Sequence, residues 1–407
     1  MEQEITLNLP FLIAGVIIFL GFLGTLFFQK TSIPDVLLLL GIGVVLGPLT
    51  GWIKADTLKE ITPYFARLAL IIIIFEGGMH LNFDSLIKYF IGGMGLGVIG
   101  FLLSTMGVYL FGIYALEMTS MNSLLLGCIL GGTCSSIIIP LITKMKVREE
   151  TCSILSLESV LTDIFVLIGT VLLIKVQLMG EVKASQVMNA LAGSFSIALV
   201  AGIIAGFIWI KALGSVKLTA LSYMTTLAAA LVLFSVVEMA QGSGAVAVFT
   251  FGLVLRNGTR FLRVIDTNKT FQLNTKIEEF HGEFTFFIRT YFFVYLGLLI
   301  TFDLFRRYDI LQNGLIISLS LIIARYLTVW LLCGIYKPMR TERITYFIMI
   351  PRGLAASVVA SLPAESGIPG TENFITYTIL AVLVSNIFMV FGTLLFTRNN
   401  VPPETDG

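Results

Sequence analysis

The chain has 407 residues, of which 57% are hydrophobic and only 13% are charged, and its formal net charge is +1. A soluble domain usually carries about 25% charged residues, so this composition excludes an ordinary soluble protein. Apolar windows of about 20 residues recur along the sequence, and each can cross the ~30 Å hydrocarbon core of a bilayer. Such long runs exclude a membrane β-barrel, and the near-neutral charge gives no indication of a nucleic-acid partner. We therefore predict an all-α polytopic membrane protein that contacts lipid.

Taken in chain order, the apolar runs predict about thirteen membrane spans. They cover residues 9–28, 35–50, 65–79, 89–114, 122–143, 152–174, 187–210, 218–237, 243–256, 284–301, 311–335, 344–363 and 374–396. The first run has no small-residue cleavage site after it, so we interpret it as a span and not as a signal peptide. Residues 257–283 are polar and charged, and they predict a cytoplasmic connector. No soluble regulatory domain is expected in the chain.

Lysine and arginine are distributed unevenly among the predicted loops. Most of them fall on one side of the membrane if the amino terminus lies outside. Because cytoplasmic loops are enriched in basic residues, we predict an outside amino terminus and a cytoplasmic carboxyl terminus, which requires an odd number of spans. Arg289 and Arg325 fall inside predicted spans, where we expect them to reach the interface or to pair with local groups such as Glu283.

Two of the predicted spans are interrupted. The fifth contains GGTCSSIIIP and the twelfth contains PRGLAASVVASLP. Proline removes a helix donor and glycine weakens a helix, and broken backbone at membrane depth is tolerated only inside protein or beside a cavity. The two breaks are seven spans apart, so the two helices run in opposite directions. This pattern predicts two inverted six-helix repeats with two broken crossing helices, as in transporters.

The sixth predicted span, 152–174, contains the stretch SLESVLTDIF, in which Glu158 and Asp163 are acidic. An ionised carboxylate near the bilayer centre costs at least about 2.5–3.5 kcal/mol, so an acid there indicates a functional site. Helical spacing places Ser159 and Asp163 on one face, and Glu158 and Thr162 on the neighbouring face. One face therefore presents a carboxylate with a hydroxyl one turn away.

We expect Glu158 to form a core ion pair with Arg352, which lies at the break in the twelfth span. Direct ion binding by Glu158 is the alternative. If Glu158 pairs with Arg352, Asp163 has no protein partner. Burial favours the neutral form of Asp163, whereas a nearby arginine favours its charged form. A proton and a metal cation would thus compete for its oxygens. Hard oxygen ligands suit a small alkali ion, so the expected metal ligands are Asp163, Ser159 and Thr133, with a backbone carbonyl freed near the break as the alternative to the Thr133 hydroxyl.

A resemblance to a known family rests on an ordered set of motifs. The stretch LESVLTDIF resembles the E-S-L-L-N-D motif of the cation/proton antiporter superfamily, in the branch of prokaryotic sodium/proton antiporters and animal sodium/proton exchangers. GGTCSSIIIP resembles the broken helix that usually reads T-D-P. Further similar stretches, in family order, are IIIIFEGGMHLNFDSL, GSGAVAVFTFGLVLRN, FFVYLGLLI and IIARYLTVWL. The resemblance extends from about residue 10 to residue 396.

The resemblance implies a role for each candidate site residue. Asp163 stands at the position of the essential ion- and proton-binding aspartate, which acts as the catalytic group of exchange. The implied cation-binding residues are Asp163, Ser159, Thr162, Thr133 and Cys134, the implied core ion pair is Glu158 with Arg352, and the implied acid on the cytoplasmic access route is Glu76.

The resemblance also implies how the chain is organised. A core ion-transport domain, 89–174 and 311–396, would move against a dimerisation domain, 1–80 and 218–301, with 187–210 as a linker helix. The family works as a homodimer in the cell membrane and contributes to pH homeostasis.

Two departures from the family pattern concern selectivity. Cys134 replaces the aspartate of T-D-P, and Thr162 replaces the asparagine, so the site lacks one charge and one amide. Na+ is the favoured cation, with Li+ and K+ as alternatives.

The same positions bear on stoichiometry. Family members with two adjacent aspartates and a core lysine tend to be electrogenic. A single aspartate with an arginine that stays protonated predicts electroneutral one-for-one exchange.

Other functions are weighed against this interpretation. A sodium-coupled solute transporter of related fold would need a roomy polar cavity, and few polar residues remain once the ion site is built. A channel or ion sensor has no carbonyl filter or ring of acids in the sequence to support it. An enzyme is not expected, because no intramembrane Ser/His pair or histidine metal cluster occurs. No cofactor is expected beyond the transported cation and H+.

Overall fold

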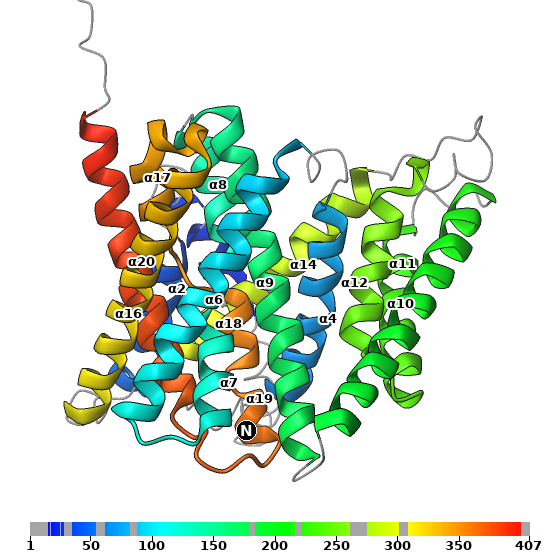
Figure 1. The fold of residues 1–407 in the computed structure, drawn as a ribbon, viewed down its shortest axis with the longest axis horizontal. Helices are drawn as coiled ribbons and strands as arrows, with labels where there is room; N and C mark the ends of the chain where they lie inside the picture. The colour runs from blue at the N-terminus through cyan, green and yellow to red at the C-terminus, as the bar shows by residue number, and fades with distance from the viewer. Residues whose placement is uncertain are drawn as a thin grey trace, which may run out of the picture.

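The computed structural model describes most of the chain, in the ranges 15–16, 18–24, 26–27, 35–53, 62–81, 88–145, 147–179, 184–215, 222–260, 275–300 and 308–399. Within these ranges every regular element is a helix. The helices lie side by side, with α16 and α20 at one end of the row and α10 and α11 at the other (Figure 1).

Seven apolar segments of the described chain are long enough to cross a membrane. They are α4 (Thr62–His80), α6 (Phe90–Tyr114), the α7–α8 pair (Ser120–Leu130 and Ser135–Met145), α9 (Glu149–Leu178), α10 (Ala184–Ser215), α16 (Tyr308–Ile335) and α20 (Phe374–Asn399). Shorter apolar segments are α2 (Asp35–Val44) with the π-helical turn η1 (Val45–Leu49), α12 (Gly244–Arg256), and α18 (Leu354–Val359) with α19 (Leu362–Glu365). Two more are parts of longer helices: Met224–Met239 in α11 (Ser222–Met239) and Thr285–Leu299 in α14 (Thr275–Leu299).

These helices confirm the predicted all-α polytopic membrane protein. The count of thirteen stays a prediction, because much of the first predicted span, 9–28, lies outside the described residues. The predicted connector 257–283 is described only in part. Its last residues belong to α14, which begins at Thr275, earlier than the span predicted from 284.

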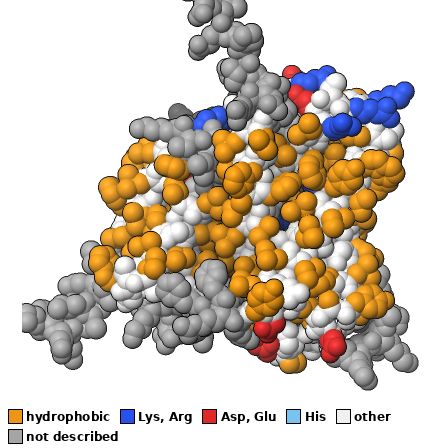
Figure 2. All heavy atoms as spheres, turned by 90° about the vertical axis from the view of Figure 1, so that its left-hand side faces the viewer, with side chains coloured by type: hydrophobic (Ala, Val, Ile, Leu, Met, Phe, Trp, Pro, Cys, Tyr) orange, Lys and Arg blue, Asp and Glu red, His pale blue; other side chains and the backbone are white. Residues whose placement is uncertain are grey.

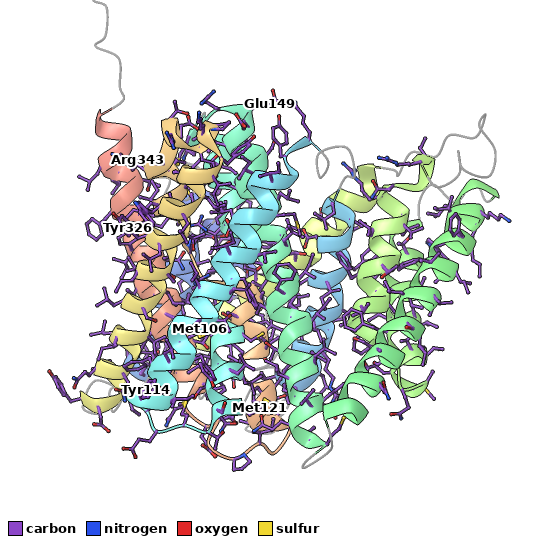
Figure 3. All side chains as sticks on the ribbon, in the orientation of Figure 1. Met106, Tyr114, Met121, Glu149, Tyr326 and Arg343 are labelled. Carbon is purple, nitrogen blue, oxygen red and sulfur yellow. The ribbon has the colours of Figure 1, made fainter. Side chains whose placement is uncertain are left out.

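The surface has the pattern of a membrane protein. Hydrophobic side chains cover the middle of the face in Figure 2, and charged side chains gather at its upper and lower edges. Trp330 on α16 is 64% exposed, as is Phe391 on α20. Glu149 and Arg343 lie at one end of the bundle, and Tyr114 and Met121 lie at the other (Figure 3). The exposed apolar middle fits contact with lipid.

Both predicted helix breaks are present, and they meet. Between α7 and α8 the chain leaves the helix over 131–134, and after α17 (Arg343–Ile348), which follows the short helix η2 (Lys337–Glu342), it leaves the helix over 349–353. The backbone N–H of Cys134 donates to the carbonyl of Pro351 at 2.9 Å. A backbone hydrogen bond therefore joins the two interruptions, which satisfies polar groups that lipid could not.

Close helix contacts depend on glycine at several crossings. Gly252 of α12 lies against α4, and a Cβ built on it would lie 2.5 Å from the carbonyl oxygen of Phe75. At the centre of the bundle, α9 packs against α4, α6, α7, α8, α12 and α18. The acidic stretch of α9 is therefore surrounded by protein.

We expect Gly252→Ala to lower the free energy of unfolding by about 1–3 kcal/mol, because the backbone of α4 must move to admit the methyl group. Thermal unfolding of the purified protein in detergent measures the effect. Gly41→Ala on α2 is the control, since a Cβ there meets nothing within 4 Å. Equal melting temperatures for the two variants would contradict the tight α4–α12 crossing.

Candidate functional site

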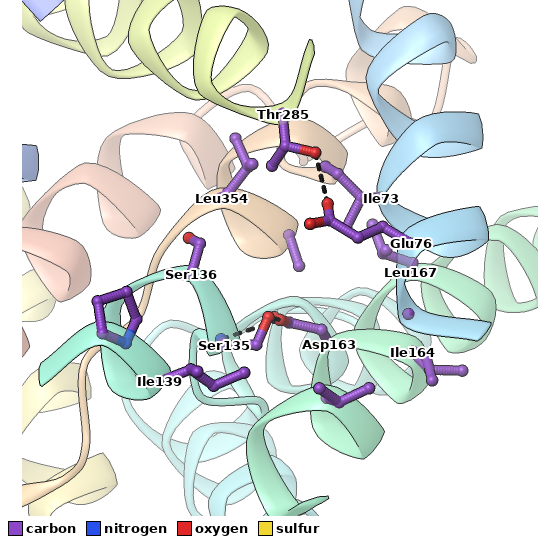
Figure 4. A pocket seen from close by; sticks show the side chains of 14 residues that line it. Ile73, Glu76, Ser135, Ser136, Ile139, Asp163, Ile164, Leu167, Thr285 and Leu354 are labelled. Atoms are coloured by element: carbon purple, nitrogen blue, oxygen red, sulfur yellow. Dashed lines mark hydrogen bonds between the residues drawn. The ribbon is translucent and has the colours of Figure 1, made fainter. Parts of the chain in front are cut away.

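A cavity of about 180 Å³ lies where α4, α8, α9, α14 and α18 meet. Its polar lining consists of Glu76, Ser135, Ser136, Asp163 and Thr285, and its remaining lining is apolar (Figure 4). Since one water occupies roughly 30 Å³ of liquid, the cavity has room for an alkali cation with a few waters. The cavity therefore combines carboxylates and hydroxyls inside the helix bundle.

Asp163 lies on the wall of the cavity that α9 forms, and it is 7% exposed. Its Oδ2 accepts a hydrogen bond from the backbone N–H of Ser135 at 3.0 Å and another from the Ser135 hydroxyl at 2.5 Å. Among the described residues, no basic nitrogen lies within salt-bridge distance of this carboxylate. Asp163 is thus hydrogen-bonded, and no basic side chain of the described residues forms an ion pair with it.

Glu76 is the second acid of the cavity. It comes from α4 and accepts a hydrogen bond from the hydroxyl of Thr285 on α14 (Figure 4). The structure therefore brings Glu76 and Asp163, both named from the sequence, to one cavity from two different helices.

Two other predicted ligands, Thr133 and Thr162, form a hydrogen-bond cluster behind the cavity lining. The backbone N–H of Thr133 donates to Oγ1 of Thr162 at 3.1 Å, and the Thr133 hydroxyl donates to Oε1 of Glu158 at 2.8 Å. Thr162 also donates to the carbonyl of Ser159 at 3.2 Å. These bonds tie the break after α7 to α9, and neither threonine lines the cavity described here.

Ser159 and Cys134 also lie outside the cavity lining. The Ser159 hydroxyl donates to the carbonyl of Ser156 in its own helix at 3.1 Å, although Ser159 and Asp163 share a helix face as predicted. The Cys134 sulfur lies 3.2 Å from the Ser136 hydroxyl. Their roles as cation ligands stay predictions, as does that of Thr133.

The partner predicted for Glu158 was wrong. Glu158 pairs with Arg325 of α16 through two hydrogen bonds, Nη1 to Oε1 at 3.0 Å and Nη2 to Oε2 at 3.4 Å. Arg352 instead donates to the carbonyl of Gly131 at 3.1 Å and to that of Gly132. Arg352 lies in the non-helical segment that crosses the first break, so its guanidinium meets the unpaired carbonyls at the end of α7.

Arg289, expected near the interface or beside Glu283, also has a different partner. Its Nη2 lies 2.7 Å from Oδ2 of Asp35, and its Nη1 donates to the carbonyl of Ser136 at 3.4 Å. These contacts connect α2 and α14 with the start of α8, next to the cavity.

The comparison with known proteins agrees with the motifs. The model of the sodium/hydrogen exchanger transmembrane family matches residues 15–397. The chain belongs to this family. It is 26% identical over 418 residues to the K(+)/H(+) antiporter NhaP2 of Shewanella sp. (strain MR-4), covering 98% of this chain and 69% of that one. It is also 26% identical over 356 residues to the Na(+)/H(+) antiporter 1 of Methanocaldococcus jannaschii, covering 85% of this chain and 81% of that one.

A solved structure in this family has the same fold. The sodium proton antiporter MjNhaP1 from Methanocaldococcus jannaschii at pH 8 superimposes with a TM-score of 0.80 at 24% identity, covering 96% of this chain and 100% of that one. Family membership, predicted from the ordered motifs, is thus confirmed over nearly the whole chain.

Three polar residues of the cavity, Ser135, Ser136 and Thr285, were not predicted from the sequence. The two serines directly follow the Gly-Gly-Thr-Cys interruption, which is a signal that they begin a new helix and face the break. Thr285 carries no such signal, because its position depends on how α14 packs against α4. For Arg325, the signal was an arginine in the middle of an apolar run, which requires a buried acid as partner.

We expect Glu158→Gln and Arg325→Gln each to destabilise the protein by about 3–5 kcal/mol, because each change leaves one buried charge unpaired. The double variant should lose less than the sum of the two, since neither charge then remains. Thermal unfolding in detergent of the single and double variants gives the coupling energy.

The matched control combines Glu158→Gln with Arg352→Gln, whose coupling energy should be smaller, because no hydrogen bond joins these two side chains in the structure. If Arg352→Gln instead relieved the loss caused by Glu158→Gln and Arg325→Gln did not, the assignment of the ion pair would be wrong.

Proposed function

We propose that this protein is a secondary active antiporter that exchanges a monovalent cation for protons across the cell membrane at Asp163. The supporting observation is a buried carboxylate in a small polar cavity, inside a membrane-spanning bundle, with no basic partner among the described residues. Relatives named as K(+)/H(+) and Na(+)/H(+) antiporters support the same reaction.

The exchange follows from the two ways in which such a carboxylate is neutralised. A bound proton removes its charge, and a bound alkali cation compensates it. An empty, ionised carboxylate is costly inside the membrane. The site therefore switches from one side of the membrane to the other only when Asp163 carries a proton or a cation. This couples the movement of the cation to the movement of protons in the opposite direction.

Alternating access would use the organisation that the family suggests. The core domain (89–174 and 311–396) moves against a dimerisation domain (1–80 and 218–301), with 187–210 as linker, in a homodimer with inverted repeats. The position of the cavity supports this division, because Asp163 and Ser135 come from the first domain and Glu76 and Thr285 from the second. The amino terminus lies outside and the carboxyl terminus in the cytoplasm.

The chemistry of the cavity supports a small monovalent cation. Its polar groups are carboxylate and hydroxyl oxygens, which suit hard cations. Organic ligands usually occupy pockets of about 300–1,000 Å³, so a cavity of about 180 Å³ favours an ion over an organic solute. Na+ is the favoured cation, Li+ and K+ are the alternatives, and the antiporter would serve pH homeostasis.

Asp163→Asn should abolish exchange, because the amide neither takes up a proton nor carries the charge that binds a cation. Purified protein in liposomes, with a pH-sensitive dye inside and Na+, Li+ or K+ added in turn, measures this loss. Asp309→Asn changes an exposed acid in the first turn of α16 and should exchange normally. Normal exchange by Asp163→Asn would overturn the site assignment.

One Asp163 that carries either one cation or one proton predicts electroneutral exchange. A membrane potential imposed at equal sodium concentration and equal pH on both sides should therefore leave the rate of radioactive sodium uptake at its value without a potential, whereas a pH gradient should raise it. Uptake driven by the potential alone would contradict the one-for-one stoichiometry.

A further inference from the structure

Ser135 supplies both hydrogen bonds that the described residues give to the carboxylate of Asp163. Its backbone N–H and its hydroxyl donate to the same oxygen, Oδ2. The second bond, at 2.5 Å, is at the short end of the range for a hydrogen bond between two oxygens. Oδ1 receives no hydrogen bond from the described residues. The two oxygens of Asp163 are therefore inequivalent, because one is held by Ser135 and the other is left for the contents of the cavity.

The position of Ser135 at the start of α8 explains why it reaches Asp163. The first amides of a helix have no partner within the helix. The two amides before Ser135 already have partners where the two breaks cross. The amide of Cys134 donates to the carbonyl of Pro351, and the amide of Thr133 donates to the hydroxyl of Thr162. Ser135 is thus the first residue after the crossing whose amide is available to the carboxylate on α9.

The other hydroxyls near Asp163 have other partners in the structure. The Ser136 hydroxyl, which also lines the cavity, lies 3.2 Å from the sulfur of Cys134. Thr133 donates to Glu158, and Ser159 donates to its own helix. Thr285 donates to Glu76 across the cavity. Of these neighbouring hydroxyls, the one that contacts Asp163 is that of Ser135 (Figure 4).

We propose that Ser135 is a positioning residue of the exchange site, which fixes Oδ2 of Asp163 so that Oδ1 is the oxygen that receives the cation or the proton. This inference rests on the proposed function. A carboxylate that is already oriented loses little freedom when an ion binds, so the affinity of the site is higher than that of a freely rotating acid. Both donors of Ser135 contribute. One substitution removes the hydroxyl alone, and another removes both the hydroxyl and the backbone N–H.

The test uses three substitutions at Ser135. Ser135→Ala removes the hydroxyl, Ser135→Thr keeps both donors, and Ser135→Pro removes both. Proline is tolerated here because Ser135 is the first residue of α8, where a helix accepts proline well. Initial rates of exchange in liposomes at one fixed pH give the KM for the cation and the maximal rate of each variant.

We expect the KM to rise at least about tenfold in Ser135→Ala, which corresponds to the loss of one hydrogen bond to a charged group, and further in Ser135→Pro. Ser135→Thr should stay close to the original KM, and the maximal rates should change little. Thr143→Ala is the matched control, since this exposed hydroxyl of the same helix donates only to the carbonyl of Ile139. If Ser135→Pro fails to fold, the Ala and Thr variants still decide the question.

A second measurement separates this inference from the proposed function. Infrared difference spectra, recorded when cation is added to the detergent-solubilised protein, report the carboxylate stretch that is absent in Asp163→Asn. Ser135→Ala should shift this band, and Thr143→Ala should not. A shifted band in a protein that shows no exchange would uphold the positioning role and refute antiport. Normal exchange with an unchanged KM and an unshifted band in Ser135→Ala and Ser135→Pro would overturn the positioning role and leave antiport intact.

Discussion

The carboxylate of Asp163 lies inside a membrane-spanning bundle and has no basic partner in the part of the chain that the structure describes, and the arrangement of the site follows from this. The neighbouring acid, Glu158, is neutralised by Arg325, so its charge is fixed and structural. Under the proposed function, the charge of Asp163 is compensated by the cation or the proton that enters the cavity. One ion pair thus connects α9 with α16, while Asp163, a few residues further along α9, is the acid that we propose for exchange.

The two helix breaks provide the polar groups that make this arrangement stable. At the end of α7 the carbonyls of Gly131 and Gly132 accept hydrogen bonds from the guanidinium of Arg352. The C-terminal end of a helix carries a partial negative charge, which stabilises this cation. At the start of α8 the free amide of Ser135 faces Asp163. A continuous helix would satisfy all of these backbone groups internally and would offer nothing to either charge.

Local features of the sequence predicted most of the fold. Apolar length predicted the spans, and glycine and proline predicted both breaks, because these effects act within a few residues of the chain. Asp163 and Glu76 were conspicuous as acids in apolar runs. The partner of Glu158 could not be predicted, since Arg325 and Arg352 both lie in apolar segments and the choice between them depends on how α16 and the second break pack. Ser135 and Thr285 became visible only when the start of α8 and the position of α14 were known.

The central claim is that a proton and a cation exclude each other at Asp163. It is tested most directly by counting the protons released when Na+ or K+ binds to the purified protein, in weakly buffered detergent solution at a pH where the cation-free site is protonated. The account predicts close to one proton released for each cation bound, and none from the Asp163→Asn variant. Saturable cation binding to the unaltered protein without proton release would mean that both ions occupy the site together, and it would contradict the account.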